Sequence, residues 1–138
     1  MINFLRFRSP VIRYDLRLLI GGLVCVVLLS GCSGRVAPVD VGKALVALES
    51  SLDRWKEGKK PEDLLEESPP ITANEFEWSR GAKLLDYEIV GDEKNADQSL
   101  IAWVKLKLAS PDGKISETTA KYIINTSPEL TVLRMMAR

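Results

Sequence analysis

The sequence lacks histidine and contains only two cysteines, Cys25 and Cys32. Histidine is the commonest general base and the commonest metal ligand, so its absence removes the ordinary forms of both kinds of site. Cys25 lies in an apolar segment that we expect to be removed with the N-terminus, and the remaining Cys32 alone cannot form a multi-cysteine metal site. The sequence also has no catalytic triad, phosphate-binding loop or dinucleotide-binding pattern. We therefore expect no metal and no cofactor, and we do not expect an enzyme.

A basic stripe is also missing. The chain of 138 residues has 19 basic and 19 acidic residues, which gives a formal net charge of zero. Residues 1–31 hold four arginines and one aspartate, whereas residues 32–138 hold 15 basic and 18 acidic residues. Neutralisation of phosphates by Lys and Arg supplies most of the affinity for nucleic acids. A mildly acidic domain without a basic stripe excludes nucleic acid from the expected partners.

The N-terminal segment has the three parts of an export signal in the required order. Residues 1–17 are basic, residues 18–29 (LLIGGLVCVVLL) are apolar or glycine, and Ser30 and Gly31 are small. A membrane-spanning helix needs about 20 apolar residues, and this run of 12 is shorter. We therefore expect residues 1–31 to be a signal peptide that is removed, with an ordinary cleaved or uncleaved signal as the alternative.

The four residues Leu29-Ser30-Gly31-Cys32 resemble the lipobox of bacterial lipoproteins, in which an aliphatic residue and two small residues precede an invariant cysteine. The resemblance implies cleavage between Gly31 and Cys32 and a diacylglycerol group on Cys32, often with a further acyl chain on the new amino terminus. Cys25 does not fit this pattern, because Val24 precedes it where a small residue is required. The resemblance also implies a lipid bilayer as the first partner and a cell-envelope membrane, on its periplasmic or outer side, as the location.

We expect residues 32–38 to be the lipidated cysteine and a short tether. Helical periodicity begins after them. From Val41 to Trp55, apolar residues recur at three- and four-residue spacing, which predicts one apolar helix face of about four turns. Asp40 is a suitable N-cap for this helix, and Gly58 is suitable for its C-terminal stop. A second short helix is predicted over Pro61–Glu67, because proline is favoured at the first helical position.

One further helical turn is predicted over Asn74–Arg80, with Asn74 as its cap. Beyond it the apolar period changes to two, which is typical of strands. The expected strands are centred on Leu85, Tyr87 and Ile89, on residues 100–108, on residues 115–125 and on residues 130–136. A polar loop at 91–98 and a turn at Ser110–Lys114 separate the first three. Short connections favour antiparallel neighbours, and the long helix must cover the apolar face.

We therefore expect one α+β domain over residues 39–138, with N-terminal helices packed on a curved four-stranded antiparallel meander. This element order, together with Trp78, Gly81 and the Pro-Asp-Gly-Lys hairpin, resembles the cystatin-like, or nuclear-transport-factor-like, α+β cone superfamily. That superfamily contains isomerases, cyclases, dehydratases and many non-catalytic binding modules, so its fold selects no function. An enzyme of this type would use Asp or Tyr between helix and sheet. Tyr87 and Tyr122 are candidates for that role, and packing as core aromatics is the alternative.

Trp103 is the main candidate for binding a partner. Because its strand buries Leu100, Ala102 and the alternate residues after them, Ile101 and Trp103 are expected on the opposite face. Ile123 on the next strand shares that orientation. The three side chains are expected to form an apolar patch with lysines at its rim, which is the composition of a protein-docking surface. The alternative is that another part of the chain covers them.

Together these features predict a membrane-anchored lipoprotein of the cell envelope, whose non-enzymatic domain binds a partner protein or a small ligand. A small pocket enzyme of the ketosteroid-isomerase-like type is one alternative. A structural module that dimerises through its outer sheet face is another. Because only about six residues separate Cys32 from the predicted domain, we expect the domain to work close to the membrane surface.

Overall fold

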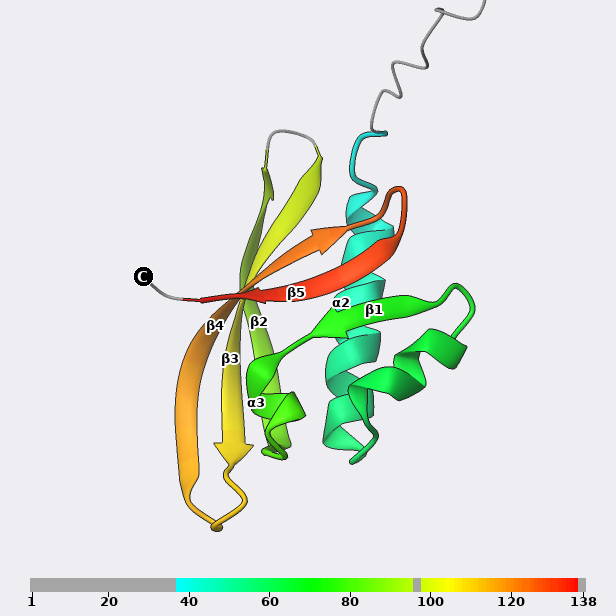
Figure 1. Cartoon of the computed structure of the whole chain (residues 1–138). Helices are drawn as coiled ribbons and strands as arrows, with labels where there is room; N and C mark the ends of the chain where they lie inside the picture. Colours follow the sequence, from blue (N-terminus) through cyan, green and yellow to red (C-terminus); the bar gives the residue numbers. More distant parts are fainter. Residues whose placement is uncertain (1–36, 96–97, 137–138) are drawn as a thin grey trace, which may run out of the picture. The chain divides into compact units, whose positions relative to one another are not determined.

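The computed structural model describes residues 37–95 and 98–136, so the predicted cleavage and lipidation positions Gly31 and Cys32 lie outside the described residues. Within these residues, helices come first, followed by a short strand, a helical turn and then the longer strands, and Figure 1 shows their arrangement. The helices are α2 (Val41–Lys56), the 3-10 helix η1 (Pro61–Glu66) and α3 (Phe76–Ser79). The strands are β1 (Ile71–Asn74), β2 (Lys83–Asn95), β3 (Ser99–Ala109), β4 (Ile115–Asn125) and β5 (Leu130–Met135).

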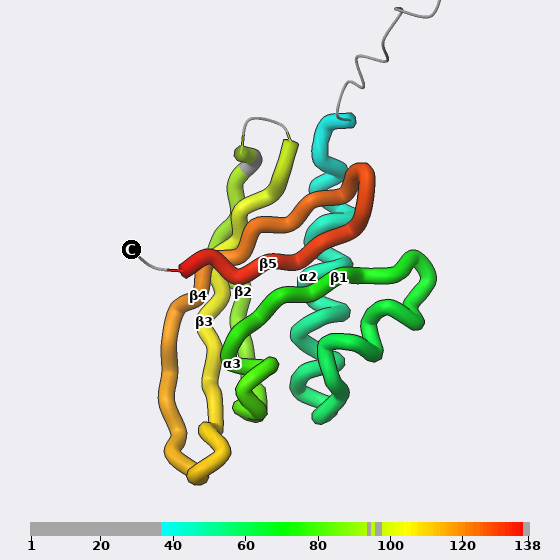
Figure 2. Tube along the Cα trace, viewed as in Figure 1, coloured from blue at the N-terminus to red at the C-terminus, as the bar shows by residue number. Residues whose placement is uncertain are grey.

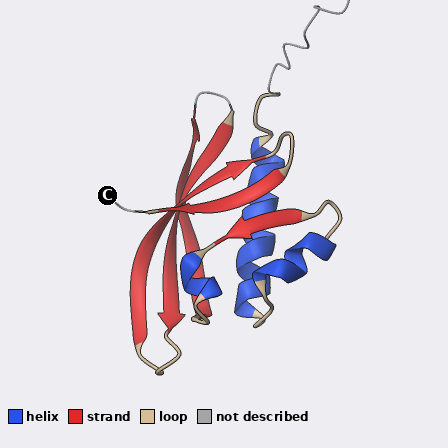
Figure 3. Cartoon of the chain, viewed as in Figure 1, coloured by secondary structure: helices blue, strands red, loops and turns tan. Residues whose placement is uncertain are grey.

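The strands form one five-stranded open sheet in the order β1-β5-β4-β3-β2. The pairs β2–β3, β3–β4 and β4–β5 are antiparallel, and β1 pairs with β5 in parallel. The helix α2 lies across one face of this sheet (Figure 3). The predicted α+β class and the packing of a helix on the sheet are confirmed. The prediction of four strands, all antiparallel, is wrong, because β1 adds a fifth strand and makes the sheet mixed.

Strand β1 has only four residues, so no apolar period marks it in the sequence. Its register on β5 runs from Ile71 opposite Leu130 to Asn74 opposite Leu133, and Ile71 is buried. The strand therefore depends on a partner about sixty residues later in the chain. Asn74 belongs to this strand, so its predicted role as the cap of the following turn is wrong. Glu75 is the cap, and its carboxylate accepts a hydrogen bond from the backbone N–H of Trp78 at 2.9 Å.

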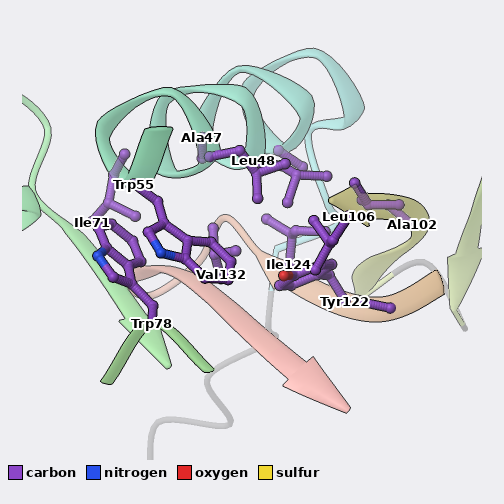
Figure 4. Packing of buried hydrophobic residues seen from close by; sticks show 14 of the residues in the cluster. Ala47, Leu48, Trp55, Ile71, Trp78, Ala102, Leu106, Tyr122, Ile124 and Val132 are labelled. Atoms are coloured by element: carbon purple, nitrogen blue, oxygen red, sulfur yellow. The ribbon is translucent and has the colours of Figure 1, made fainter. Parts of the chain in front are cut away.

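Both predicted ends of the long helix are confirmed. The Asp40 carboxylate accepts a hydrogen bond from the backbone N–H of Lys43 at 3.0 Å. After the last turn, Gly58 has a φ of +80°, which glycine adopts without a steric penalty. The buried side of α2 faces the sheet, and Figure 4 shows Ala47, Leu48 and Trp55 directed into the interior.

Strand β3 alternates as predicted, and its inward side chains pack against α2 and β4. These buried residues are Leu100, Ala102, Val104, Leu106 and Leu108. The long β3–β4 hairpin can be followed in Figure 2, and its turn has Gly113 at a φ of +86°, which confirms the predicted glycine turn. Strand β4 has the predicted bounds. Tyr122 and Ile124 lie on its inner side, with Ala120.

Strand β2 departs twice from simple alternation, because its register on β3 shifts between Leu84 and Asp86 and between Ile89 and Gly91. A bulge inserts an extra residue and reverses the facing of the residues on one side of it. Leu84 is consequently buried and Leu85 is exposed, so the predicted alternation that groups Leu85 with Tyr87 and Ile89 is wrong at Leu85. The strand also continues to Asn95, through much of the segment predicted as a loop.

Candidate interaction surface

The sheet face turned away from α2 carries a second set of apolar side chains. Ile101 pairs with Ile123, which pairs with Leu133 on β5. One row further along, Trp103 pairs with Lys121, which pairs with Met135. Directly paired residues share a face and lie next to each other. We call this set the outer patch; it consists of Ile101, Trp103, Lys121, Ile123, Leu133 and Met135.

The structure thus brings Ile101, Trp103 and Ile123 together on one face, but it exposes them unequally. Ile101 is only 7% exposed, although it is absent from the core cluster beneath α2. Trp103 and Ile123 are half-buried, and Met135 is exposed. The accessible apolar surface therefore comes from the residues around Ile101. Sequence reasoning missed Leu133 and Met135, because placing them needs the pairing of β5 with β4.

Trp103 is held between a glycine and a lysine. Gly91 is its partner on β2, and a Cβ atom built on Gly91 would lie 3.9 Å from Cε3 of the indole. A β-carbon at this position would therefore make an ordinary van der Waals contact with the ring. On the other side, Nζ of Lys121 lies 5.4 Å from the ring centroid, a cation–π contact. Such a contact contributes about 0.5–1 kcal/mol at an exposed site. It positions the ammonium group at the edge of the outer patch.

Lys105 and Lys107, which share the outer side of β3 with Trp103, are both paired with carboxylates. Lys105 lies 3.7 Å from the carboxylate of Glu88, and Lys107 lies 3.8 Å from that of Glu117. Exposed pairs of this kind contribute only about 0–1 kcal/mol to stability, but they cancel each other's charge. Within residues 37–95 and 98–136, no carboxylate lies within 4 Å of the Lys121 ammonium group. Lys121 is therefore the cation that the outer patch offers to a partner.

The two tyrosines considered for a pocket lie in different surroundings. Tyr87 is half-buried, and its hydroxyl donates a hydrogen bond to the Asp53 carboxylate at 2.7 Å. Burial and this carboxylate raise the pKa of Tyr87 above its ordinary value. Tyr122 is 1% exposed, and its hydroxyl has no hydrogen-bond partner among the described residues. Burial, with the nearby Glu75 carboxylate, raises the pKa of Tyr122 as well.

A buried ion pair next to Tyr122 was not predicted. The Arg134 guanidinium donates to the Glu75 carboxylate, and the two side chains are 10% and 4% exposed. The guanidinium also lies 4.2 Å from the centroid of the Phe76 ring. Arg134 has no partner within its own sequence neighbourhood, so a linear pattern cannot identify the pair. Both side chains, like that of Tyr122, are nearly inaccessible to solvent. These groups therefore belong to the packed interior.

In the part of the chain that the structure describes, no group of three or more Cys, Asp and Glu side chains is arranged to hold a metal ion. No helix in that part is both long and apolar enough to cross a membrane. Comparison with known proteins adds no relative to this picture. No protein-family model, no curated protein and no solved structure matches the chain.

Proposed function

We propose that this chain is a bacterial lipoprotein of the cell envelope, anchored to a membrane by lipid on Cys32. We further propose that its domain has the cystatin-like cone fold and binds a partner protein through the outer patch without catalysing a reaction. The lipobox-like sequence Leu29-Ser30-Gly31-Cys32 supports the anchor. The helix packed on a five-stranded sheet supports the fold.

The outer patch is the observation that carries the binding proposal. It places a tryptophan, a methionine and branched aliphatic side chains on a sheet face that does not belong to the core under α2. Tryptophan and methionine are enriched at protein interfaces. A half-buried tryptophan surrounded by apolar neighbours is the usual centre of such a surface. The domain therefore keeps apolar area where a partner can cover it.

The positive charge of Lys121 in the outer patch indicates the partner's chemistry. Lys121 lies over Trp103, whereas Lys105 and Lys107 face carboxylates of their own chain. A complementary surface would carry an apolar area to cover Trp103 and a carboxylate at its edge to reach Lys121. We therefore propose an envelope protein with an apolar surface and an acidic rim, and not a second copy of this chain.

The proposed anchor limits where this partner can be. One residue spans at most about 3.5 Å of extended chain, so the five steps from Cys32 to Ala37 reach at most roughly 18 Å. Only Pro38–Asp40 separate Ala37 from the start of α2, so the start of α2 would also stay close to the lipid surface. A partner must accordingly be able to reach the membrane surface.

The interior supports a binding role over the pocket-enzyme alternative. Glu75 and Arg134 neutralise each other, and Tyr122 is enclosed. An enzyme that used these groups would need at least one of them within about 3 Å of a substrate atom. These groups are packed in the core instead.

Photo-crosslinking from the outer patch tests the proposal. A photoreactive amino acid replaces Met135, which is exposed at the edge of the patch, and the control replaces Val46 on the exposed side of α2. In native membranes we expect one discrete crosslinked protein from position 135 and none from position 46. The identified protein, purified, should bind the unmodified chain, and Lys121→Glu should weaken this binding at least about tenfold.

Two outcomes would contradict the proposal. The same products from positions 135 and 46 would mean that the outer patch is not selective. A product of twice the chain's mass would identify a second copy and favour the dimerising module. Separately, Cys32→Ser should leave an unlipidated and uncleaved precursor, and normal processing of this variant would refute the anchor.

A further inference from the structure

An open cleft lies away from the outer patch, between the C-terminal end of α2, the start of η1 and the turn that joins α3 to β2. Its volume is about 710 Å³, which falls within the range of small-molecule sites. We call it the tryptophan groove, and its important lining residues are Trp55, Trp78, Lys59, Lys60, Lys83 and Glu62. No residue of the outer patch lines it.

Two stacked indoles form the base of the tryptophan groove. The rings of Trp55 and Trp78 are 5.6 Å apart between centroids and inclined by 14°, and Figure 4 shows them next to each other. The indole N–H of Trp55 donates to the Ala82 carbonyl at 2.7 Å. The indole N–H of Trp78 donates to the Lys59 carbonyl at 2.8 Å. Because both acceptors belong to the wall of the groove, the base and the wall hold each other in place.

Two glycines create this wall. Gly58 follows α2 with a φ of +80°, and the next residue, Lys59, directs its carbonyl to the indole N–H of Trp78. Gly81 follows α3 with a φ of +88°, and the next residue, Ala82, directs its carbonyl to the indole N–H of Trp55. Residues with a β-carbon rarely adopt such angles. The shape of the groove is thus set by the backbone before any ligand binds, which reduces the entropy cost of binding.

The rim of the tryptophan groove is positively charged in a domain that is acidic as a whole. Three lysines, Lys59, Lys60 and Lys83, line it together with one carboxylate, Glu62. Among the described residues, no carboxylate lies within 4 Å of any of the three ammonium groups. An anion in the groove would therefore meet three ammonium groups that form no direct ion pair with a described carboxylate, although Lys59 also borders the acidic side chains of Asp63, Glu66 and Glu67.

We propose that the tryptophan groove binds a phosphate ester carried on an apolar or flat ring. The lysine ammonium group is a compact charge that binds phosphate oxygens, and a phosphate dianion can engage more than one of them. The exposed edge of Trp78, which is 7% exposed, and the Pro61 ring would contact the ligand's ring, whereas Trp55 lies beneath Trp78 and is 2% exposed. This site shares no residue with the outer patch, so it stands independently of the proposed partner protein.

Titration of the full chain with 1-naphthyl phosphate tests this site by nuclear magnetic resonance. The chain has three tryptophans, and each contributes one indole N–H signal. We expect the signals of Trp55 and Trp78 to shift saturably and that of Trp103 to stay in place. The triple variant K59Q/K60Q/K83Q removes three exposed charges, and we expect it to weaken binding at least about tenfold.

A matched variant separates this site from general attraction of anions. K105Q/K107Q/K121Q removes the same number of charges from β3 and β4, and it should change the affinity less than about twofold. Uncharged 1-naphthol should bind at least tenfold more weakly than the phosphate. The proposal is overturned by the absence of a saturable shift, by equal weakening in both triple variants, or by equal binding of 1-naphthol.

Discussion

Strand β3 supplies alternate residues to the two faces of the sheet, and these faces have different environments. On the inner face, Ala102 and Val104 are fully buried beneath α2. On the outer face, Trp103 is half-buried under a lysine. The inner tryptophans, Trp55 and Trp78, donate their indole N–H groups to backbone carbonyls. The comparison teaches that similar apolar residues stabilise the fold on one face and remain accessible for binding on the other.

The largest expected effect is on the inner face. Replacing Trp55 by alanine removes a buried ring that stacks on Trp78 and bonds to Ala82. The free energy of unfolding should fall by about 3–5 kcal/mol, as for other large-to-small changes in cores. Urea unfolding followed by circular dichroism measures this change. A loss below 1 kcal/mol would show that the base of the tryptophan groove is not part of the core.

The buried ion pair should show the second largest effect. Arg134→Met leaves the Glu75 carboxylate buried without its partner, and we expect a loss of about 3 kcal/mol. The exposed pair provides the control, since Lys105→Met should cost no more than about 1 kcal/mol. The double variant E75Q/R134M should be less destabilised than the sum of its two single variants. Additive losses would mean that the two side chains do not interact.

The orphan hydroxyl of Tyr122 gives an effect of opposite sign. Tyr122→Phe removes a buried group without a partner among the described residues, so stability at pH 7 should rise by about 1 kcal/mol. The pKa of Tyr122 is raised in the folded state. The folded chain then binds more protons than the unfolded chain above about pH 10, and stability falls as pH rises.

This fall in stability should be shallower in Tyr122→Phe than in the unmodified chain. Unfolding in urea at pH 9, 10 and 11 measures both slopes. Tyr87 also has a raised pKa and contributes to the same slope, so Tyr87→Phe serves as the reference variant. Destabilisation of more than 1 kcal/mol at pH 7 by Tyr122→Phe would reveal a partner for the hydroxyl.

The smallest effects compare adjacent isoleucines of β4. Ile124 is fully buried on the inner face, whereas Ile123 is half-buried on the outer face. Ile124→Val should cost about 1 kcal/mol, and Ile123→Val less than about 0.5 kcal/mol. Chemical denaturation with replicate measurements can separate these values. Equal losses would contradict the distinction between the two faces.

On β3 and β4, the alternation of apolar residues was enough to predict which side chains share a face. It assigned Leu100 and Ala102 to the core and Ile101, Trp103 and Ile123 to the opposite side, in agreement with the register of β3 and β4. This works because a strand has a fixed period of two and the side-chain facing follows from it. The two ends of α2 and the turn of the β3–β4 hairpin were also predictable, because caps and turns depend on a few neighbouring residues and their backbone angles.

Features set by distant partners could not be predicted. Strand β1 is defined by β5, and the bulge beside Leu84 is defined by the register on β3. The outer patch extends to Leu133 because β5 pairs with β4, and the Glu75–Arg134 pair joins residues 59 positions apart. The exposure of each patch residue likewise depends on neighbours from other strands. Lipidation at Cys32 stays a prediction from the sequence alone.

The most direct test of the account combines binding and stability in one variant, Trp103→Ala. We predict that this change abolishes the crosslinked product from position 135 in native membranes. The free energy of unfolding should fall by no more than about 1 kcal/mol, because the ring belongs to the outer face. An unchanged crosslinked product would contradict the role of the outer patch. A loss of 3 kcal/mol or more would instead assign Trp103 to the folding core.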